Sequence, residues 1–310
     1  MILTVTMNAS IDKRYIVEQN QEGQVNRVLS SVYTAGGKGL NVSKSIALAG
    51  MPVWATGLTA GYAGAYIEEN LEKHKIANKF LRVKGESRSC INIWDKKKKI
   101  QTEFLEPGFV VSPVDYKSFL ERFTELVNDV AVVAISGSVP MGIPENVYHT
   151  LVSIVKKAQK KVILDSSGKL LEEGIAAKPT MIKPNIDEIR MLTGQACNDM
   201  PTLVQGALRL REKGVEIVVI SLGAGGSILV SSKGVYSAEV PIVQAANTVG
   251  CGDAMVAGFA LGLQQGLNDQ KMLNMASAIS AASAMSEETG AFQERDRCVL
   301  EKQIIITKLD

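Results

Sequence analysis

Short apolar runs alternate with longer helix-like segments along most of this chain, and this alternation restricts its possible folds more than any other feature. Runs of this kind fill parallel sheets that are buried on both faces. We expect strands at residues 2–7, 53–58, 130–135, 162–164 and 217–220. Helix-like segments lie at residues 40–49, 63–74, 119–127, 145–160, 186–193, 202–213, 254–265 and 268–287. The order predicts an α/β fold with a doubly wound, mostly parallel sheet, flanked by helices and joined by right-handed crossovers.

Two segments interrupt this alternation, at about residues 13–34 and 80–105. The second contains Ser89-Cys90-Ile91-Asn92-Ile93-Trp94, whose apolar and polar residues alternate as in a strand. The lysines at 96–99 are typical of a solvated hairpin turn, which we favour over a phosphate site. We therefore expect a small β-sheet beside the main one, acting as a lid, within a single domain spanning residues 1–310.

Charge and composition exclude several classes of protein. The chain has 34 basic and 32 acidic residues, a net charge of +2, and 5% aromatic residues, which does not suit a nucleic-acid-binding protein. Its four cysteines form no C-x-x-C pair, and with only two histidines a zinc site lacks ligands. The N-terminal residues have no basic region and we expect them to form a strand and not a signal peptide, and no uncharged apolar stretch is long enough to predict a membrane span. We expect a cytoplasmic protein that acts on a small molecule without a membrane or nucleic-acid partner.

The strongest local signal is the turn Gly250-Cys251-Gly252-Asp253 at the start of a predicted helix. Its glycines let successive backbone N–H groups point the same way, and the positive end of the helix dipole lies behind them, which favours an anion such as phosphate. An aspartate in such a turn makes sense if its carboxylate takes a proton from a hydroxyl that then attacks phosphorus. The alternative is that Asp253 only caps the helix.

A second glycine cluster, Gly36-Gly37-Lys38-Gly39-Leu40-Asn41, also precedes a helix. It is not a Walker A loop, because Val32 stands where a glycine is needed and Lys38 is followed by Gly39. Open backbone, the Asn41 amide and the Lys38 cation suit a ligand with many hydroxyls. A turn with an incidental lysine is the alternative.

Three further groups of residues follow predicted strands. Asn8 and Asp12 lie after the first strand, at the end where open α/β sheets bind ligands. Lys183-Pro184-Asn185 opens a helix with Glu188 on the same face, either to order water around Mg²⁺ or to cap the helix. The segment 221–226, which contains Ser221, Gly223 and Gly226, is either a nucleotide-phosphate contact or a hairpin turn.

Taken together and in this order, the three motifs resemble the ribokinase-like sugar kinases, in particular their phosphofructokinase B branch. The motifs are Gly36 to Asn41, Lys183-Pro184-Asn185 with Glu188, and Gly250 to Asp253. The resemblance extends from residue 1 to about 289, nearly the whole chain. It implies a central sheet flanked by helices, a small β-sheet lid that serves as a homodimer interface, and ATP and Mg²⁺ as cofactors.

The resemblance also implies roles for individual residues. Asp253 would be the catalytic base, and the backbone of Gly250, Cys251, Gly252 and Asp253 would form an anion hole. Asn185 and Glu188 would organise Mg²⁺ through water, while the nucleotide site would comprise Lys183, Asn185, Ser221, Gly223 and Gly226. The sugar would be held by Asp12, Gly37, Asn41 and Ser138. An existing phosphate on the sugar would meet Lys38, Arg88 and Arg27, since an arginine can bind phosphate with two hydrogen bonds.

Members of this branch include tagatose-6-phosphate kinases and 1-phosphofructokinases, and the segment 84–106 looks closer to the former. The chain departs from the pattern at Ala9, where proline is usual, and at Cys251, where alanine is usual. Two alternatives are a sugar-phosphate or nucleotide sensor without turnover and a vitamin kinase of the same fold. The sensor does not explain Asp253, and the vitamin kinase leaves Lys38 and Arg88 without an anionic partner.

Overall fold

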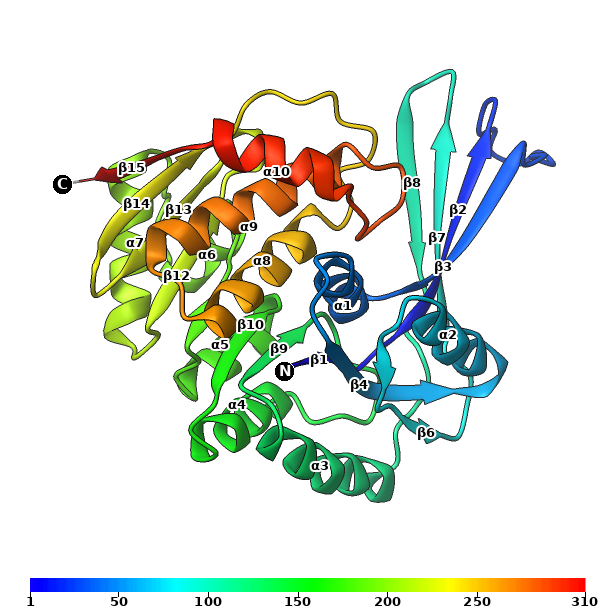
Figure 1. The fold of residues 1–310 in the computed structure, drawn as a ribbon. Coiled ribbons are helices and arrows are strands. Elements are labelled where there is room, and N and C mark those ends of the chain that lie inside the picture. The colour runs from blue at the N-terminus through cyan, green and yellow to red at the C-terminus, as the bar shows by residue number, and fades with distance from the viewer. Residues whose placement is uncertain (310) are drawn as a thin grey trace.

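The large sheet of the computed structural model is buried on both faces, and the structure describes residues 1–309 (Figure 1). Its strands are β1 (Ile2–Thr6), β4 (Val53–Ala60), β5 (Ala77–Asn78), β6 (Leu81–Val83), β9 (Val132–Ser136), β10 (Lys161–Asp165), β11 (Met181–Ile182), β12 (Ile217–Ser221), β13 (Ser227–Ser231), β14 (Gly234–Glu239) and β15 (Ile305–Leu309). They follow the order β15-β14-β13-β12-β11-β10-β9-β1-β4-β5, with β6 beside β4. Every pairing from β5 to β12 is parallel, which confirms the predicted mostly parallel sheet.

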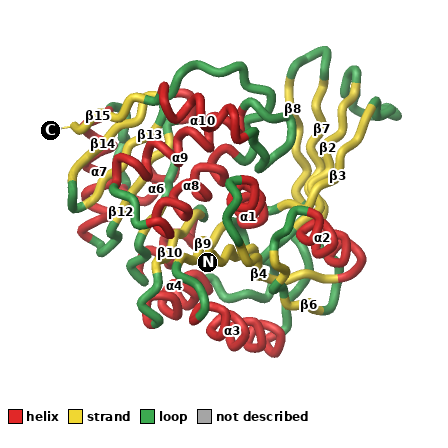
Figure 2. The backbone as a smooth tube through the Cα atoms, in the orientation of Figure 1, coloured by secondary structure: helices red, strands yellow, loops and turns green. Residues whose placement is uncertain are grey.

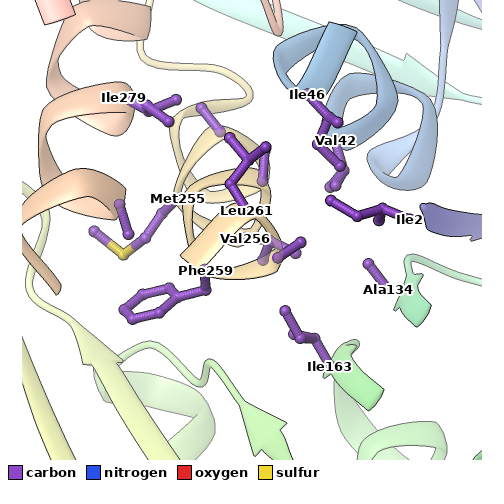
Figure 3. Close-up of a cluster of buried hydrophobic side chains, with 14 of the residues drawn as sticks. Ile2, Val42, Ile46, Ala134, Ile163, Met255, Val256, Phe259, Leu261 and Ile279 are labelled. Carbon is purple, nitrogen blue, oxygen red and sulfur yellow. The ribbon is translucent and has the colours of Figure 1, made fainter. Parts of the chain in front are cut away.

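Two layers of helices cover the large sheet (Figure 2). One apolar cluster joins it to α1 (Lys38–Leu48), α2 (Gly61–Lys73), α8 (Cys251–Gln265), α9 (Asp269–Ala284) and α10 (Glu294–Gln303). The other joins it to α3 (Pro113–Asn128), α4 (Val147–Lys157), α5 (Gly168–Ala176), α6 (Ile186–Thr193) and α7 (Met200–Glu212). Successive side chains of a strand point to opposite faces of the sheet. Ala134 of β9 therefore packs in the first cluster (Figure 3), and the next residue, Ile135, packs in the second.

A separate sheet of four strands stands away from the large one (Figure 1). It contains β2 (Ser10–Val17), β3 (Ser30–Gly36), β7 (Arg88–Asp95) and β8 (Ile100–Leu105), in the order β3-β2-β7-β8. β2 pairs antiparallel with β3 and parallel with β7, and β7 pairs antiparallel with β8. We call this sheet the lid. A smaller separate sheet was therefore predicted correctly, although residues 18–29 form a loop between its first two strands.

The C-terminal part differs most from the sequence-based expectation. The strands β13, β14 and β15, which pair antiparallel, were not predicted, and neither were the helices α5 and α10. We expected a helix at 268–287, but α9 ends at Ala284. The Ser286 hydroxyl accepts a hydrogen bond from the Glu288 N–H at 3.1 Å, and such a local bond competes with helix continuation.

No helix within residues 1–309 combines the length and the apolar character that crossing a membrane requires.

The contact between α8 and α9 depends on a residue without a side chain. A Cβ atom added at Gly258 of α8 would overlap the backbone of Ala276 in α9. We expect Gly258→Ala to lower the free energy of unfolding by about 1–3 kcal/mol, because overpacking forces the two helices apart. Urea unfolding measures the change. Gly225→Ala is a matched control, since its Cβ would meet nothing nearer than Leu222 Cβ at 3.4 Å; an equal loss in both variants would contradict this explanation.

Candidate active site

A cleft of about 920 Å³ lies between the lid and the carboxyl ends of the parallel strands. The chain leaves the buried strands at this edge, so polar residues that follow them gather there. Ser136 ends β9, Asp165 ends β10, Lys183 follows β11 and Ser221 ends β12, and all four line the cleft. The inner face of the lid supplies the opposite wall, including Asp12. The cleft is therefore built from segments that are far apart in the sequence.

Asp253 lies in the first turn of α8 and is only 5% exposed. The helix begins after Gly250, whose φ of 84° is in the left-handed region that glycine adopts without strain. Among residues 1–309 the Asp253 side chain makes no cap bond; its Oδ2 instead accepts a hydrogen bond from Asn41 Nδ2 of α1 at 2.8 Å. The alternative in which Asp253 only caps the helix does not match this geometry.

The surroundings of Asp253 hold its carboxyl group close to the point of ionisation at neutral pH. Burial is the main cause, and the negative charge of Asp165 adds to it, which together raise the pKa of Asp253 to about 7. Lys38, the Asn41 hydrogen bond and Lys183 act in the opposite direction and lower that pKa. A group with such a pKa can both accept and release a proton near pH 7.

Asp165 is a central residue of the site that the sequence analysis missed. It is 3% exposed, with Lys183 Nζ at 3.3 Å from its Oδ1 and Lys38 Nζ at 3.7 Å from its Oδ2. The charge of Asp165 raises the pKa of Lys38, so this lysine stays protonated. A signal was available: Asp165 directly follows a buried apolar run, as Asp12 follows β1. Its role depends on two lysines that are 127 and 18 residues away in the chain.

The N-terminus of α8 offers free hydrogen-bond donors to the cleft. Ala254 N–H donates to Gly250 O at 2.8 Å and Cys251 N–H to Thr248 O at 3.4 Å. Within residues 1–309, the N–H groups of Gly252 and Asp253 have no acceptor. Such donors, with the helix dipole behind them, form a site that attracts an anion. Lys183 Nζ lies beside this turn, since a Cβ on Gly252 would be 3.3 Å from it.

Asn185 and Glu188 form a capping box at the start of α6. Asn185 Oδ1 accepts from Glu188 N–H at 2.8 Å, and Glu188 Oε2 accepts from Asn185 N–H at 2.9 Å. The capping alternative from the sequence is thus present in the structure. Both side chains nevertheless line the cleft, and Glu188 Oε1 takes part in no hydrogen bond or ion pair among residues 1–309. One carboxylate oxygen therefore remains available at the cleft.

On the lid side, Asp12 and Arg88 lie close together. Asp12 Oδ1 accepts a hydrogen bond from Ser10 Oγ at 2.7 Å, and burial raises the pKa of the Asp12 carboxyl group. Arg88 donates from Nε to Asn8 O at 3.1 Å and from NH1 to Glu106 O at 3.2 Å, which leaves its other terminal nitrogen without a partner among residues 1–309. Both residues come from strands of the lid, so their distance from Asp253 depends on where the lid lies.

The structure brings most of the predicted site residues to one cleft. Those that line it are Asp12, Gly37, Lys38, Asn41, Arg88, Ser138, Lys183, Asn185, Glu188, Ser221, Gly250, Gly252 and Asp253. Those that do not line it are Arg27, Cys251, Gly223 and Gly226.

Each of the four outlying residues has a structural reason for its place. Arg27 is exposed in the loop between β2 and β3, on the lid. The Cys251 thiol is half-buried, and burial raises its pKa to about 11, which disfavours the reactive thiolate. Gly223 and Gly226 form the tight connection between β12 and β13, as the hairpin alternative predicted.

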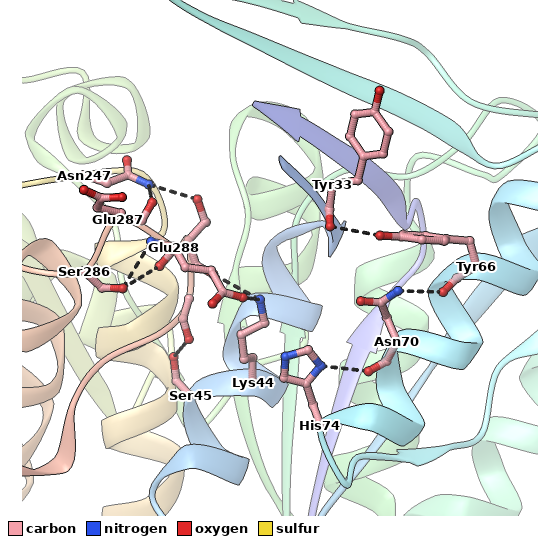
Figure 4. A network of polar contacts seen from close by, with 12 residues as sticks. Tyr33, Lys44, Ser45, Tyr66, Asn70, His74, Asn247, Ser286, Glu287 and Glu288 are labelled. Carbon is pink, nitrogen blue, oxygen red and sulfur yellow. Dashed lines mark hydrogen bonds and ion pairs between the residues drawn. The ribbon is translucent and has the colours of Figure 1, made fainter. Parts of the chain in front are cut away.

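A loop at residues 286–290, which the sequence analysis placed partly in a helix, forms another wall of the cleft (Figure 4). Lys44 of α1 is buried and pairs with Glu288 at 2.8 Å. Asn247 Nδ2 donates to Glu287 O at 3.3 Å and to Thr289 Oγ1 at 3.1 Å. These contacts fix the loop to α1 and to the segment that leads into α8. Within residues 1–309, no three Asp, Glu, His or Cys side chains are arranged to hold a metal ion by themselves.

Known proteins resemble this chain along nearly its whole length. Residues 5–296 match the pfkB family carbohydrate kinase domain. A tagatose-6-phosphate kinase from Staphylococcus epidermidis is 37% identical over 293 residues, which cover 94% of each chain. The structure of phosphofructokinase-2 from Escherichia coli with potassium has a TM-score of 0.91 at 25% identity, covering 97% of this chain and 98% of that one. A protein described as a possible 1-phosphofructokinase from Thermotoga maritima has a TM-score of 0.91 at 27% identity and covers 100% of both chains.

The raised pKa of Asp253 has a consequence for stability that does not depend on activity. An unfolded aspartate has a pKa of about 3.9, so its stabilising contribution in the folded state is present at low pH and is lost as pH rises through about 7. Asn at this position cannot ionise. We expect Asp253→Asn to be more stable than the parent at pH 8, by about 1–4 kcal/mol, with the difference shrinking toward pH 5.

Urea unfolding at pH 5 and pH 8 measures this difference. Asp187→Asn is a matched control, because Asp187 is 83% exposed and should show no such pH dependence. A stability gap that is the same at both pH values would contradict the assigned pKa.

Proposed function

The chain belongs to the pfkB family of carbohydrate kinases, and we propose that it transfers the γ-phosphoryl group of ATP to a hydroxyl of a ketohexose phosphate. The observation that carries the proposal is the position of Asp253. Its buried carboxyl group, with a pKa of about 7, lies in the same helical turn as free N–H donors that suit a phosphate. Cations on the surrounding walls suit an anionic substrate.

In this mechanism Asp253 accepts the proton of the substrate hydroxyl as its oxygen forms a bond to the γ-phosphorus. The bond from that phosphorus to the bridging oxygen of ATP breaks, and ADP leaves with the electron pair. The N–H groups of Gly252 and Asp253 stabilise the charge on the transferring group. Asn41 keeps the Asp253 side chain pointed at the hydroxyl through its 2.8 Å hydrogen bond.

The residues of the cleft fit a magnesium ion held through water. Mg²⁺ prefers oxygen ligands and keeps several of its waters, so one or two carboxylates are enough. Glu188 Oε1 is unpaired, and Asp165 Oδ2 is buried without a hydrogen-bond donor among residues 1–309. We assign Asn185 and Glu188 to the ion through water and add Asp165 as a third candidate. When bound, Mg²⁺ would offset phosphate charge.

We propose Lys38 and Arg88 as partners of the phosphate that the substrate already carries. Lys38 keeps its charge because Asp165 raises its pKa, and Arg88 retains a terminal nitrogen without a partner in the described chain. Asp12 lies beside Arg88 and suits sugar hydroxyls. The 37% identity to a tagatose-6-phosphate kinase supports tagatose 6-phosphate as the first substrate to test, with fructose 1-phosphate as the second.

We propose that Ser221 contacts the nucleotide, because it ends β12 at the cleft beside Asn185, to which it is bridged. Gly223 and Gly226 follow it in the turn and would act by letting the chain turn sharply there, since they do not line the cleft. Cys251 would contribute only its backbone. Arg27 does not line the cleft of its own chain.

A substrate panel tests the function. Release of ADP from Mg-ATP is measured with tagatose 6-phosphate, fructose 1-phosphate, fructose 6-phosphate, free fructose and pyridoxal. We expect one ketohexose phosphate to have the highest kcat/KM. Binding of a sugar phosphate without any ADP release would favour the sensor, and a preference for pyridoxal would favour the vitamin kinase.

Removal of the proposed base should reduce turnover far more than binding. We expect Asp253→Asn to lower kcat by roughly 10²–10⁴-fold with a nearly unchanged KM. In the parent, kcat/KM should rise with pH and level off above about 7, because Asp253 accepts a proton only when ionised. Asp129→Asn, an exposed residue at the end of α3, is the control and should match the parent. Near-normal turnover of Asp253→Asn would rule out this role.

We also propose a homodimer formed through the outer face of the lid. On the face opposite Asp12, the apolar side chains of Tyr15, Ile93 and Phe104 are not fully buried, and Phe104 is 56% exposed. Figure 1 shows this sheet standing away from the body of the molecule. A face of this kind is costly to leave in water. Light scattering should give twice the chain mass of 33.3 kDa, and Phe104→Glu should shift it toward the monomer. A parent that is monomeric at micromolar concentration would refute the dimer.

A further inference from the structure

Arg14 links the lid to the body of the molecule across the cleft. Side chains alternate along β2, so Ser10, Asp12, Arg14 and Ile16 share the face that lines the cleft. Arg14 is half-buried, and its NH1 donates a hydrogen bond to the backbone oxygen of Glu287 at 2.7 Å. A hydrogen bond from a charged donor is stronger than one between neutral groups. This bond joins the lid to the loop at residues 286–290.

The loop that receives Arg14 is itself fixed to the body (Figure 4). Lys44 Nζ contacts Glu288 Oε1 at 2.8 Å, and Ser45 Oγ donates to Gly290 O at 2.9 Å. Asn247 Nδ2 donates to the same Glu287 oxygen that accepts from Arg14. The partner of Arg14 is therefore a fixed point of the body and not a free surface loop.

The same loop lies directly against the turn that carries Asp253. A Cβ atom on Gly250 would be 2.8 Å from Thr289 Cγ2, and one on Gly290 would be 3.0 Å from Asn41 Cα. Asn41 in turn holds Asp253. Arg14 thus sets the distance between the lid, which carries Asp12 and Arg88, and the loop that packs on the phosphoryl-transfer turn.

The lid also offers Arg14 a second acceptor. Asn92 of β7 is paired in register with Arg14, and residues so paired on parallel strands lie about 4.8 Å apart on the same face. Asn92 Nδ2 donates to Glu103 Oε1 at 3.1 Å, but its Oδ1 is buried and has no donor among residues 1–309. A buried oxygen without a donor is unfavourable, so a hydrogen bond from Arg14 to Asn92 Oδ1 would be stabilising.

We propose that Arg14 is a positioning residue with two alternative acceptors. With the lid over the cleft, Arg14 binds Glu287 O and holds the lid at the position seen here. When the lid swings away, the guanidinium turns back onto Asn92 Oδ1 and satisfies it. The proposal rests on the proposed kinase function, because it gives the exchange a purpose: Asp12 and Arg88 hold the substrate at a fixed place relative to Asp253.

The two acceptors make the lid an element with two defined states. In each state the charged group has a partner, so a hydrogen bond to Asn92 lowers the free energy of the open state relative to one with an unpaired charge. Tyr66 Oη donates to Tyr33 O at 2.9 Å and joins the neighbouring strand β3 of the lid to α2 (Figure 4).

We call the hydrogen bond from Arg14 to Glu287 O the latch. Hydrogen–deuterium exchange of the ligand-free protein tests it without any need for activity. We expect Arg14→Ala to speed exchange of residues 10–17 and 286–290 by about tenfold, the effect of losing one hydrogen bond to a charged group. Arg14→Lys should restore part of the protection. Lys96→Ala removes a lid charge at the hairpin tip, 52% exposed, and should leave both segments as in the parent. Parent-like exchange in Arg14→Ala would overturn the latch.

Asn92→Ala tests the second acceptor. Loss of that acceptor favours the latched state, so exchange of residues 286–290 should slow by about tenfold, and this effect should vanish in the Arg14→Ala background. Glu103→Ala controls for the lost bond between Asn92 and Glu103 and should not slow exchange. An Asn92→Ala effect of the same size in both backgrounds would overturn the two-acceptor scheme.

Kinetics then connect the latch to turnover. For the preferred sugar phosphate, Arg14→Ala should raise KM by about tenfold with a smaller change in kcat, since Arg14 places groups that bind substrate and does not touch the transferring phosphoryl group. Faster exchange without a change in KM would refute the link to substrate positioning. Faster exchange in a chain that turns over no sugar phosphate would instead refute the kinase assignment and leave the latch standing.

Discussion

The site depends on the burial of Asp253 against two lysines. Removing a carboxylate from water raises its pKa, and the neighbouring Asp165 raises it further. Lys38 and Lys183 limit the shift, so the pKa of Asp253 stays at about 7 and does not rise beyond the range where ionisation is possible. Asp165 holds both lysines in place through its two oxygens. A carboxyl group so balanced can take up a proton at neutral pH, which a surface aspartate cannot.

The packing of three helices fixes the position of this group. α8 packs closely on α9 at Gly258, and α1 packs beside it and supplies Asn41 to the carboxylate. The segment that follows α9 also contributes, because the loop at 286–290 packs against Gly250 and is anchored by Lys44. The buried helices are therefore part of the site as much as of the core, and a shift of α9 would reach Asp253 through contacts alone.

The lid divides the site between two bodies. Asp12 and Arg88 belong to the small sheet, whereas Asp165 ends a strand of the large sheet, Lys183 follows another, and Asp253 lies in α8, which packs on that sheet. A reaction that needs both sets requires the two sheets to be held at a defined separation. Few hydrogen bonds join them at the cleft, and the one from Arg14 meets the loop beside the helix turn. The loop at residues 286–290 thus links the position of the lid to the turn that carries Asp253.

The sequence by itself determined the local features. Short apolar runs specified buried strands, Gly250 and Gly252 specified the turn before α8, and period-2 alternation specified the lid strands, because these follow from backbone conformation and side-chain burial within a few residues. The sequence also placed Asp253, Asn41 and Lys38 together, although only through their likeness to the motifs of a known family.

Only the tertiary structure decided which distant groups meet. Asp165 acts because β10 ends beside Lys38 and Lys183. The ion pair between Lys44 and Glu288 holds part of an expected helix as a loop that lines the cleft. Arg14 and Asn92 are 78 residues apart, yet the parallel pairing of β2 and β7 sets them side by side. Electrostatic energies depend on distance in space and on burial, and neither quantity is local in the sequence. The sequence therefore determines which ionisable and polar side chains the site contains. The fold determines which of them become partners and how their pKa values shift.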